Sequence, residues 1–332
     1  FYLCSSVKEV EKIFRIRSKK EFDKLALKVF RYQFENQPTY QQFCTLLKRT
    51  PDVVKNVEQI PFLPISFFKS HHIITTDCQP EIVFGSSGTT QTGQSKHPVA
   101  KVEIYRESFL QAFQLQYGNP EDYIILALLP SYQERQDSSL IFMVDELIAR
   151  SQQPESGYYL NRNQELIENL MAYDRSGKNV LLIGVTYALL DLIETQTFKL
   201  QNTIIMETGG MKGRRKELVK SELHELLCAG FGVSNIHSEY GMTELLSQAY
   251  SLGKGIFECP PWMDVHIREV QDPLQFVPAG RSGGINVIDL ANVYSCSFIA
   301  TQDLGKKFEN GSFEVLGRFD NADIRGCNLL VQ

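Results

Sequence analysis

The sequence predicts an α/β protein in which helices flank a mostly parallel sheet and a smaller β-rich subdomain follows. Short apolar runs alternate with helical segments between residues 123 and 237, which is typical of a parallel sheet covered on both faces. Helical periodicity disappears after about residue 257, where short β-type runs are separated by Gly and Pro turns. The chain of 332 residues is also longer than a single hydrophobic core usually supports. We therefore expect a helical lead-in over residues 1–60, packed on the body, an α/β core over 61–255 and a β-rich subdomain over 256–332.

The individual elements follow from the spacing of apolar residues along the chain. Residues 7–48 alternate apolar and charged positions at helical spacing, and Ser18 and Glu21 have the spacing of a capping box. Continuous apolar runs, which are typical of buried parallel strands, and short β-type runs predict strands at 82–84, 123–129, 158–160, 179–184, 202–207, 234–237, 264–270, 284–288 and 312–316. Helical periodicity predicts helices at 103–117, 138–150, 165–172, 187–194 and 212–229.

Composition argues against several classes of protein. The hydrophobic content of 43% and the charged content of 22% are ordinary for a globular chain. A net charge of -5 gives no reason to expect nucleic acid or an anionic membrane surface as a partner. No run of 18 or more apolar residues is long enough for a membrane span, and the first residues do not resemble a signal peptide. The seven cysteines are scattered without C-x-x-C spacing, which predicts reduced thiols in a cytoplasmic protein.

A glycine-rich stretch after the strand at 82–84 is the first functional signal. Residues 84–96 read FGSSGTTQTGQSK. Glycines there allow backbone amides to curve around an anion, hydroxyls add donors, and a lysine follows, which is the chemistry that holds a polyphosphate. The Walker A spacing is missing, and a flexible loop is the alternative. The predicted nucleotide-binding residues here are Ser86, Ser87, Gly88, Thr89, Thr90, Gly93 and Lys96.

Further stretches downstream fit the same ligand. Gly209–Gly210 follows the strand at 202–207, and ligands of open α/β sheets bind beyond the carboxyl ends of strands. Tyr240 can stack on a purine, Thr243 can bond a phosphate oxygen and Glu244 can hold Mg²⁺. Asp303, which we place at a strand end, can bind a ribose diol. Each stretch alone would more often be structural, but their common order and spacing point to one nucleotide site.

Together these stretches resemble the adenylate-forming superfamily of acyl-CoA synthetases, luciferases and peptide-synthetase adenylation domains. Residues 84–96 look like its phosphate-binding loop, although Gln91 stands where the next glycine often falls. Residues 240–244, including Gly241, look like its Tyr-Gly-x-Thr-Glu motif, and Asp303 matches its ribose-binding aspartate. The start of its hinge motif is matched by Gly317, Arg318 and Asp320.

Within this superfamily the chain is most similar to the LuxE-type acyl-protein synthetases, with phenylacetate-CoA ligases as relatives. The stretches that carry this likeness are residues 129–132, 142–145, 207–214 and 325–329. The resemblance implies a large N-terminal adenylate-forming domain. It also implies that ATP and Mg²⁺ activate a carboxylic acid, expected to be a fatty acid, as an acyl-adenylate. The acyl group then passes to a cysteine thiol and on to a partner protein such as a reductase or carrier.

The resemblance also assigns roles to residues. Lys96 and the glycine loop would hold the β- and γ-phosphates, Thr243 and Glu244 would manage the α-phosphate and Mg²⁺, and Arg318 would bond the ribose or phosphates. Related ligases continue past the hinge into a cap with a catalytic lysine, whereas this chain stops at Gln332, so we expect that cap to be absent. LuxE-type proteins are thought to carry the acyl group on a cysteine near the C-terminus, where Cys327 stands.

Alternatives stay open at several points. Cys327 could instead be a buried packing thiol. The whole chain could be an acyl-CoA ligase of the phenylacetate type, or a nucleotide-binding relative without catalytic activity. Cys259, His266 and Cys296 could form a zinc site in the β-rich subdomain, although the spacing is long and no fourth ligand is evident. The acyl pocket is expected around residues 138–144 and near residue 237.

Overall fold

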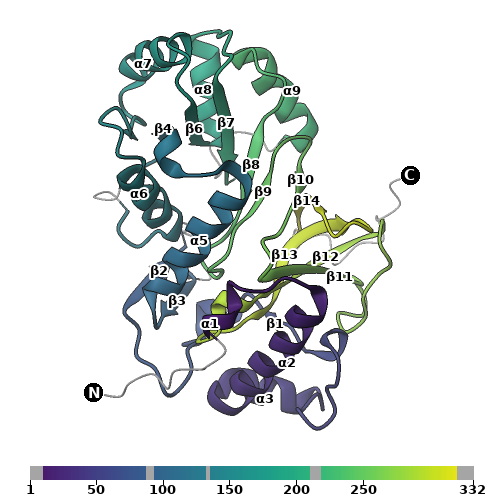
Figure 1. Ribbon diagram of the computed structural model, residues 1–332. Helices are drawn as coiled ribbons and strands as arrows, with labels where there is room; N and C mark the ends of the chain where they lie inside the picture. Colours follow the sequence, from purple (N-terminus) through teal and green to yellow (C-terminus); the bar gives the residue numbers. More distant parts are fainter. Residues whose placement is uncertain (1–9, 87–92, 132–134, 210–217, 320–332) are drawn as a thin grey trace.

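The computed structural model describes residues 10–86, 93–131, 135–209 and 218–319. It contains two large sheets in separate lobes, joined by a small hairpin and by loops (Figure 1). The first sheet has six strands in the order β5-β4-β6-β7-β8-β9. The second has the order β10-β14-β13-β12-β11, with β1 added beside β13. The predicted α/β class with a β-rich part is confirmed.

The first sheet is parallel from β5 to β8, and β9 runs antiparallel at its edge. Its strands β4 and β6 are buried at every position, which explains why their sequences are continuous apolar runs. The strands are β4 (Ile124–Leu128), β5 (Gly157–Tyr158), β6 (Val180–Val185), β7 (Thr203–Thr208), β8 (His237–Tyr240) and β9 (Ala249–Ser251).

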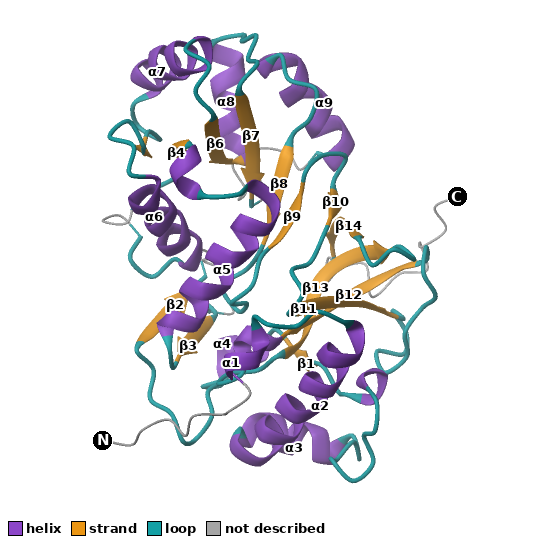
Figure 2. Cartoon of the chain, viewed as in Figure 1, coloured by secondary structure: helices purple, strands orange, loops and turns teal. Residues whose placement is uncertain are grey.

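Helices surround this sheet, as Figure 2 shows. They are α5 (Val102–Tyr117), α6 (Ser139–Ser151), α7 (Asn163–Arg175), α8 (Thr186–Thr195) and α9 (Lys220–Phe231). Helix α5 ends at Gly118, whose φ of 82° would strain any residue with a side chain. Helix α6 begins at Ser138, whose side chain accepts a hydrogen bond from the Ile141 amide. The Gly118 cap thus ends α5 shortly before β4 begins, and the Ser138 cap starts α6 after the carboxyl end of β4.

The second sheet is antiparallel apart from the β1–β13 pair. Its strands are β1 (Leu63–Pro64), β10 (Ile256–Phe257), β11 (Met263–Arg268), β12 (Ser282–Asp289), β13 (Phe298–Lys307) and β14 (Phe313–Arg318). The helical lead-in, α1 (Val10–Ile13), α2 (Lys19–Asn36) and α3 (Pro38–Leu46), lies beside this sheet (Figure 1). Phe30 of α2 packs against Phe298, and the Gln33 amide donates to the carbonyls of Asn292 and Val293. The lead-in therefore packs on the β-rich part.

A hairpin of β2 (Ile82–Gly85) and β3 (Lys96–Val99) lies between the lobes, with the short helix α4 (Phe67–Ser70) nearby. Strand β3 is missing from the sequence prediction, which took the glycine-rich stretch to run straight into the helix at 103–117. In the structure Gly85 pairs with Lys96, so both ends of the stretch are held side by side. Residues 96–99 form a strand because their backbone pairs with β2, and the spacing of apolar residues within this short segment does not reveal that pairing.

Two strand boundaries differ from the prediction in ways that matter for the site. Strand β8 runs to Tyr240, so the chain is still extended at Glu239, whereas the sequence prediction ended this strand at residue 237. Asp303 lies inside β13 and not at a strand end. The pairing of β13 with β14 shifts register between Leu304 and Gly305, and such an irregularity re-aims the neighbouring side chains.

The structure bears on two further expectations, that the thiols are reduced and that no segment spans a membrane. Cys44, Cys228, Cys259 and Cys296 are free thiols, but Cys78 is disulfide-bonded. The expectation of reduced thiols is therefore wrong at Cys78, because sequence spacing does not show which cysteines the fold brings together. Over the ranges described above, none of the helices has the length and apolar character that crossing a bilayer requires.

Candidate functional site

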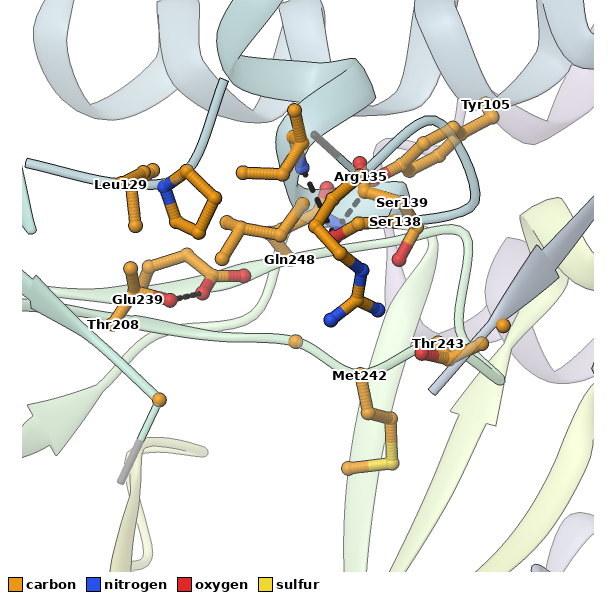
Figure 3. A pocket seen from close by; sticks show the side chains of 16 residues that line it. Tyr105, Leu129, Arg135, Ser138, Ser139, Thr208, Glu239, Met242, Thr243 and Gln248 are labelled. Carbon is orange, nitrogen blue, oxygen red and sulfur yellow. Dashed lines mark hydrogen bonds between the residues drawn. The ribbon is translucent and has the colours of Figure 1, made fainter. Parts of the chain in front are cut away.

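A cavity of about 140 Å³ lies at the carboxyl ends of β4, β7 and β8. This is where ligands bind in open α/β sheets. Helices α5 and α6 and the end of β2 complete its wall, and Figure 3 shows the side chains that surround it. The lining residues are Gly85, Tyr105, Leu129, Pro130, Arg135, Ser138, Ser139, Leu140, Ile141, Thr208, Gly209, Glu239, Gly241, Met242, Thr243 and Gln248.

A buried carboxyl group forms part of this wall. Glu239 is 9% exposed, and the Thr208 hydroxyl donates to its Oε2 over 2.5 Å. Thr208 and Glu239 are paired in register on β7 and β8, so their side chains lie on the same face of the sheet. Burial raises the pKa of Glu239 to about 7, with the charge of Glu207 adding to the effect and the Thr208 hydrogen bond opposing it. A methyl group on Gly241 would lie 2.3 Å from Glu239 Oε1, so glycine leaves room for the carboxyl there.

Polar groups from two helices complete another wall of the cavity. The Tyr105 hydroxyl donates to the carbonyl of Ser139 over 2.9 Å, and the Gln248 amide nitrogen lies 3.5 Å from the same hydroxyl. The other polar atom of Gln248, Oε1, is buried and has no hydrogen-bond partner within the described part of the chain. The side chain of Arg135 extends into the cavity (Figure 3), and its Nε donates to Asp137 Oδ1 over 3.1 Å. The cavity therefore combines a cation, a carboxyl group and an amide.

The β2–β3 hairpin is tied to the segment before α6. The Gly85 amide donates to the Asp137 carbonyl over 2.7 Å, and the Gln94 amide nitrogen donates to Asp137 Oδ2 over 3.1 Å. A methyl group on Gly85 would lie 2.7 Å from Gln94 and 2.8 Å from Asp137, so these segments approach too closely for a side chain. Ser86 pairs with Ser95 across the hairpin, and Gly93 has a φ of 87°. The predicted phosphate loop is thus anchored at both ends beside the cavity.

A second cluster joins residues that the sequence analysis assigned to the nucleotide. The Tyr240 hydroxyl donates to Asp303 Oδ2 over 2.9 Å, and Arg318 Nε donates to Asp303 Oδ1 over 3.3 Å. The Tyr240 ring makes edge contacts with Phe257 and Phe313 and is 8% exposed. Tyr240 therefore holds the carboxylate of Asp303 in place in this structure, in addition to the base-stacking role predicted for it.

Thr243 lines the cavity, and the next residue, Glu244, lies close enough to Arg318 of this cluster to feel its charge. The ring Nδ1 of His97 lies 2.7 Å from the Thr243 carbonyl. Burial lowers the pKa of His97 to about 4, so the ring is neutral and its Nδ1–H donates. The Glu244 carboxyl is hydrogen-bonded by Ser95, and burial raises its pKa against the opposing charges of Arg318 and Lys69. A buried carboxyl whose ionised form is disfavoured suits a divalent cation, which would compensate its charge.

The structure places the remaining predicted site residues as follows. Gly209, with a φ of 68°, lines the cavity together with Gly241 and Thr243. Lys96 is exposed at the start of β3 and is not among the lining residues. Six of the predicted residues lie outside the described residues: Ser87, Gly88, Thr89, Thr90, Gly210 and Cys327.

The zinc prediction is wrong. Within the described segments, no group of three or more His, Cys, Asp or Glu side chains could hold a metal ion. Cys296 is buried and donates to the Phe298 carbonyl, whereas His266 lies beside Asp264 and stacks near Phe276. Cys259, the third predicted ligand, is a half-buried free thiol. Sequence order brought these residues into one subdomain, but the strands point them to different neighbours.

Three lining residues were missed by sequence reasoning, Arg135, Glu239 and Gln248, together with Asp137, which accepts from Arg135 and Gln94. Glu239 carries a usable signal, because an acidic residue directly before Tyr240 stands near the carboxyl end of a strand where ligands bind. Gln248 carries none, since it lies directly before the edge strand β9, where a polar residue is usually solvated. Its burial depends on α5, which is distant in the sequence.

Comparisons with known proteins agree with this architecture. The profile of a family described as acyl-protein synthetase, LuxE, matches residues 14–332. The long-chain-fatty-acid–luciferin-component ligase of Vibrio harveyi is 25% identical over 325 residues, covering 90% of this chain and 84% of that protein.

Solved structures of ligases share the fold. ATP-bound MatB from Rhodopseudomonas palustris superposes with a TM-score of 0.55 at 18% identity, covering 71% of this chain and 47% of that one. An open conformation of 2-hydroxyisobutyryl-CoA ligase, in complex with 2-HIB-AMP and CoA, gives a TM-score of 0.65 at 13% identity, covering 92% and 72%. The chain thus spans about half the length of the first of these ligases.

Proposed function

Because the chain belongs to the acyl-protein synthetase family LuxE, we propose that it uses ATP to convert a carboxylic acid into an acyl-adenylate and then passes the acyl group to a thiol. The relative from Vibrio harveyi is named for a long-chain fatty acid and a luciferin component. By analogy, the acid is a fatty acid and the final acceptor is a partner protein such as a reductase or carrier.

The observation that supports this proposal is that the adjacent residues Thr243 and Glu244 relate to two polar sites: Thr243 lines the cavity, and the charge of Arg318 acts on Glu244. The cavity would hold the acid. The second site is Asp303, held by Tyr240 and Arg318, which would bond the ribose hydroxyls of ATP. The α-phosphate of a nucleotide bound this way would lie near Thr243, next to the acid. Such an arrangement brings two reactants together, which is the main contribution an enzyme can make to this reaction.

The chemistry asks for positioning and charge stabilisation. An oxygen of the acid carboxylate attacks the α-phosphorus of ATP and forms a new P–O bond. The bond from that phosphorus to the bridging oxygen breaks, and pyrophosphate leaves with the bonding electrons. Lys96 and the hairpin loop would receive the leaving phosphates, and Glu244 would hold Mg²⁺, which offsets the charge that develops on them. His97 keeps the Thr243 backbone in place.

The test of acyl activation is exchange of labelled pyrophosphate into ATP in the presence of carboxylic acids. The wild-type protein should support acid-dependent exchange, and Glu244→Gln and Asp303→Asn should lower its rate by about 10²-fold or more. The matched control is Glu314→Gln on β14, where the carboxylate pairs with Lys306 away from the cavity. No exchange with any acid across a broad panel would refute the proposed activation step.

The carrier step has a separate test. Labelled acid and ATP should leave a hydroxylamine-sensitive label on the wild-type protein and none on Cys327→Ser. Cys228→Ser, which removes a free and partly exposed thiol on α9, is the control and should label normally. Equal labelling of Cys327→Ser would exclude that cysteine as the carrier. Formation of acyl-CoA when CoA is supplied would instead support a CoA ligase of the phenylacetate type.

A further inference from the structure

We infer that the cavity selects a carboxylic acid carrying a hydrogen-bond donor, a hydroxyl or an amino group, which Gln248 and Glu239 recognise as acceptors. The inference rests on the proposed function, because it takes the cavity as the place where the acid binds. It adds a substrate class to that function: a substituted acid, in which a polar group lies on the carbon skeleton away from the reacting carboxylate.

The first observation is the unpaired oxygen of Gln248. This side chain is 3% exposed and lines the cavity. The hydroxyl proton of Tyr105 goes to the Ser139 carbonyl, so this hydroxyl can only accept from Gln248, and the amide nitrogen must face it. That fixes the amide orientation and leaves Oε1 buried without a partner among the described residues. A buried acceptor without a donor is rare in folded proteins, and this one belongs to a side chain that lines the cavity.

The second observation is the carboxyl group of Glu239 in the same wall. Thr208 supplies one hydrogen bond to Oε2, although an ionised carboxylate can accept about four. The other oxygen lies against Gly241, where no side chain is present to cover it. Figure 3 shows Glu239 and Gln248 facing the same space, with Thr208 beside the carboxyl group. The two side chains therefore offer acceptors, and no donor in the wall other than Thr208 is bonded to them among the described residues.

The rest of the cavity suits a short carbon skeleton. Leu129, Pro130, Ile141 and Met242 supply apolar contacts. The volume of about 140 Å³ is roughly ten times the 10–15 Å³ that one water needs. This space holds a small acid or the first part of a longer one. An unsubstituted chain would leave both acceptors unpaired, and sites built around such groups reject ligands that lack the matching donor.

The test compares acids with the same carbon skeleton in the pyrophosphate exchange assay. Butanoate, 3-hydroxybutanoate and 3-aminobutanoate form one set, and the corresponding eight-carbon acids form a second set. The hydroxyl and amino arms separate the two possible donors. We expect kcat/KM for one substituted acid to exceed that of the unsubstituted acid by about 10²-fold or more.

Variants connect that preference to the two side chains. Gln248→Leu and Glu239→Gln should each reduce the preference about tenfold or more. Gln114→Leu, on an exposed position of α5, is the matched control and should leave the preference unchanged.

Each result decides a different statement. Exchange with equal kcat/KM for substituted and unsubstituted acids overturns the selectivity for a donor, while acyl activation still stands. A preference that survives both variants overturns the assignment to Gln248 and Glu239. Absence of exchange with every acid refutes the proposed function itself and with it this inference.

Discussion

The two faces of the sheet at β7 and β8 hold similar side chains in opposite situations. On one face Glu207 is buried with Lys220 Nζ at 2.6 Å and with His224 close by. On the other face Glu239 is buried beside the cavity, and among the described residues only the Thr208 hydroxyl is hydrogen-bonded to its carboxyl group. The carboxyl groups are on adjacent strands, so the difference comes from what α9 does or does not bring to each face.

The difference shows in the acidity of the two groups. Burial alone would raise the pKa of Glu207, but the charge of Lys220 and hydrogen bonds from His224 and Lys220 hold it at about 2. Burial raises the pKa of Glu239 to about 7, because the hydrogen bond from Thr208 and the more distant charge of Lys220 only partly oppose it. A buried carboxylate paired with a cation is a structural feature. A buried carboxylate without such a pair destabilises the fold, and binding sites are where such groups are found.

The largest effect on stability should come from removing the cation that pairs with Glu207. Lys220→Met leaves Glu207 buried without its cation and should lower the free energy of unfolding at pH 7 by about 3–5 kcal/mol. The folded-state pKa of Glu207 lies below its usual value, so the pair stabilises above about pH 4.5 and loses its effect as the pH falls towards 2. Urea unfolding across this range measures it. Lys178→Met, whose partner Glu155 is more exposed, should cost less than about 1 kcal/mol; equal costs would contradict the comparison.

Replacing Glu239 by a neutral residue should raise the stability of the protein and not lower it. The folded-state pKa of Glu239 lies above its usual 4.5, so its effect on stability is favourable at low pH and is lost as the pH rises from about 4.5 to 7. Glu239→Gln should therefore raise the free energy of unfolding at pH 8 by on the order of 2–3 kcal/mol and have little effect at pH 4. Parallel stability curves for variant and wild type across this range would show that Glu239 does not titrate as described.

Adding a methyl group beside Glu239 tests how tightly this part of the cavity wall is packed. Gly241→Ala places a methyl group 2.3 Å from Glu239 Oε1 and should lower the free energy of unfolding by about 1–2 kcal/mol, because the carboxyl must move. It should also raise KM for the acid. Gly157→Ala, where the nearest atom is 4.0 Å away, is the control. A variant as stable as this control would mean that the carboxyl is free to rearrange.

The smallest effect should come from the one hydrogen bond that Glu239 has. Thr208→Val keeps the shape of the side chain but removes the donor, and should lower the free energy of unfolding at pH 8 by about 1 kcal/mol. Since this bond lowers the pKa of Glu239, the variant should shift that pKa further upward, which carbon-detected NMR of the Glu239 carboxyl can follow. Thr195→Val, exposed on α8, is the control. An unchanged pKa of Glu239 in Thr208→Val would contradict the role of the Thr208 hydrogen bond.

Local sequence was sufficient for the parts of this protein that depend on short-range pattern. The apolar runs at 123–129 and 179–184 are strands because a parallel sheet buries both of their faces. The glycine-rich stretch and the Tyr-Gly-x-Thr-Glu motif identified the family for the same reason, since residues in contact with a nucleotide must keep particular types at particular spacings. The motif residues that the structure describes do come together around Thr243 and Asp303.

Long-range packing decided everything else. Whether Cys296 meets His266, whether Asp303 ends a strand or sits at a bulge, and whether Gln248 has a partner depend on which elements pair and at what register. The pattern of residues around Glu207 and Glu239 gives no sign that one faces a lysine and the other a cavity. Successive side chains along a strand alternate between the two faces of the sheet, so a one-residue shift in register would exchange their surroundings, and only the tertiary structure sets that register.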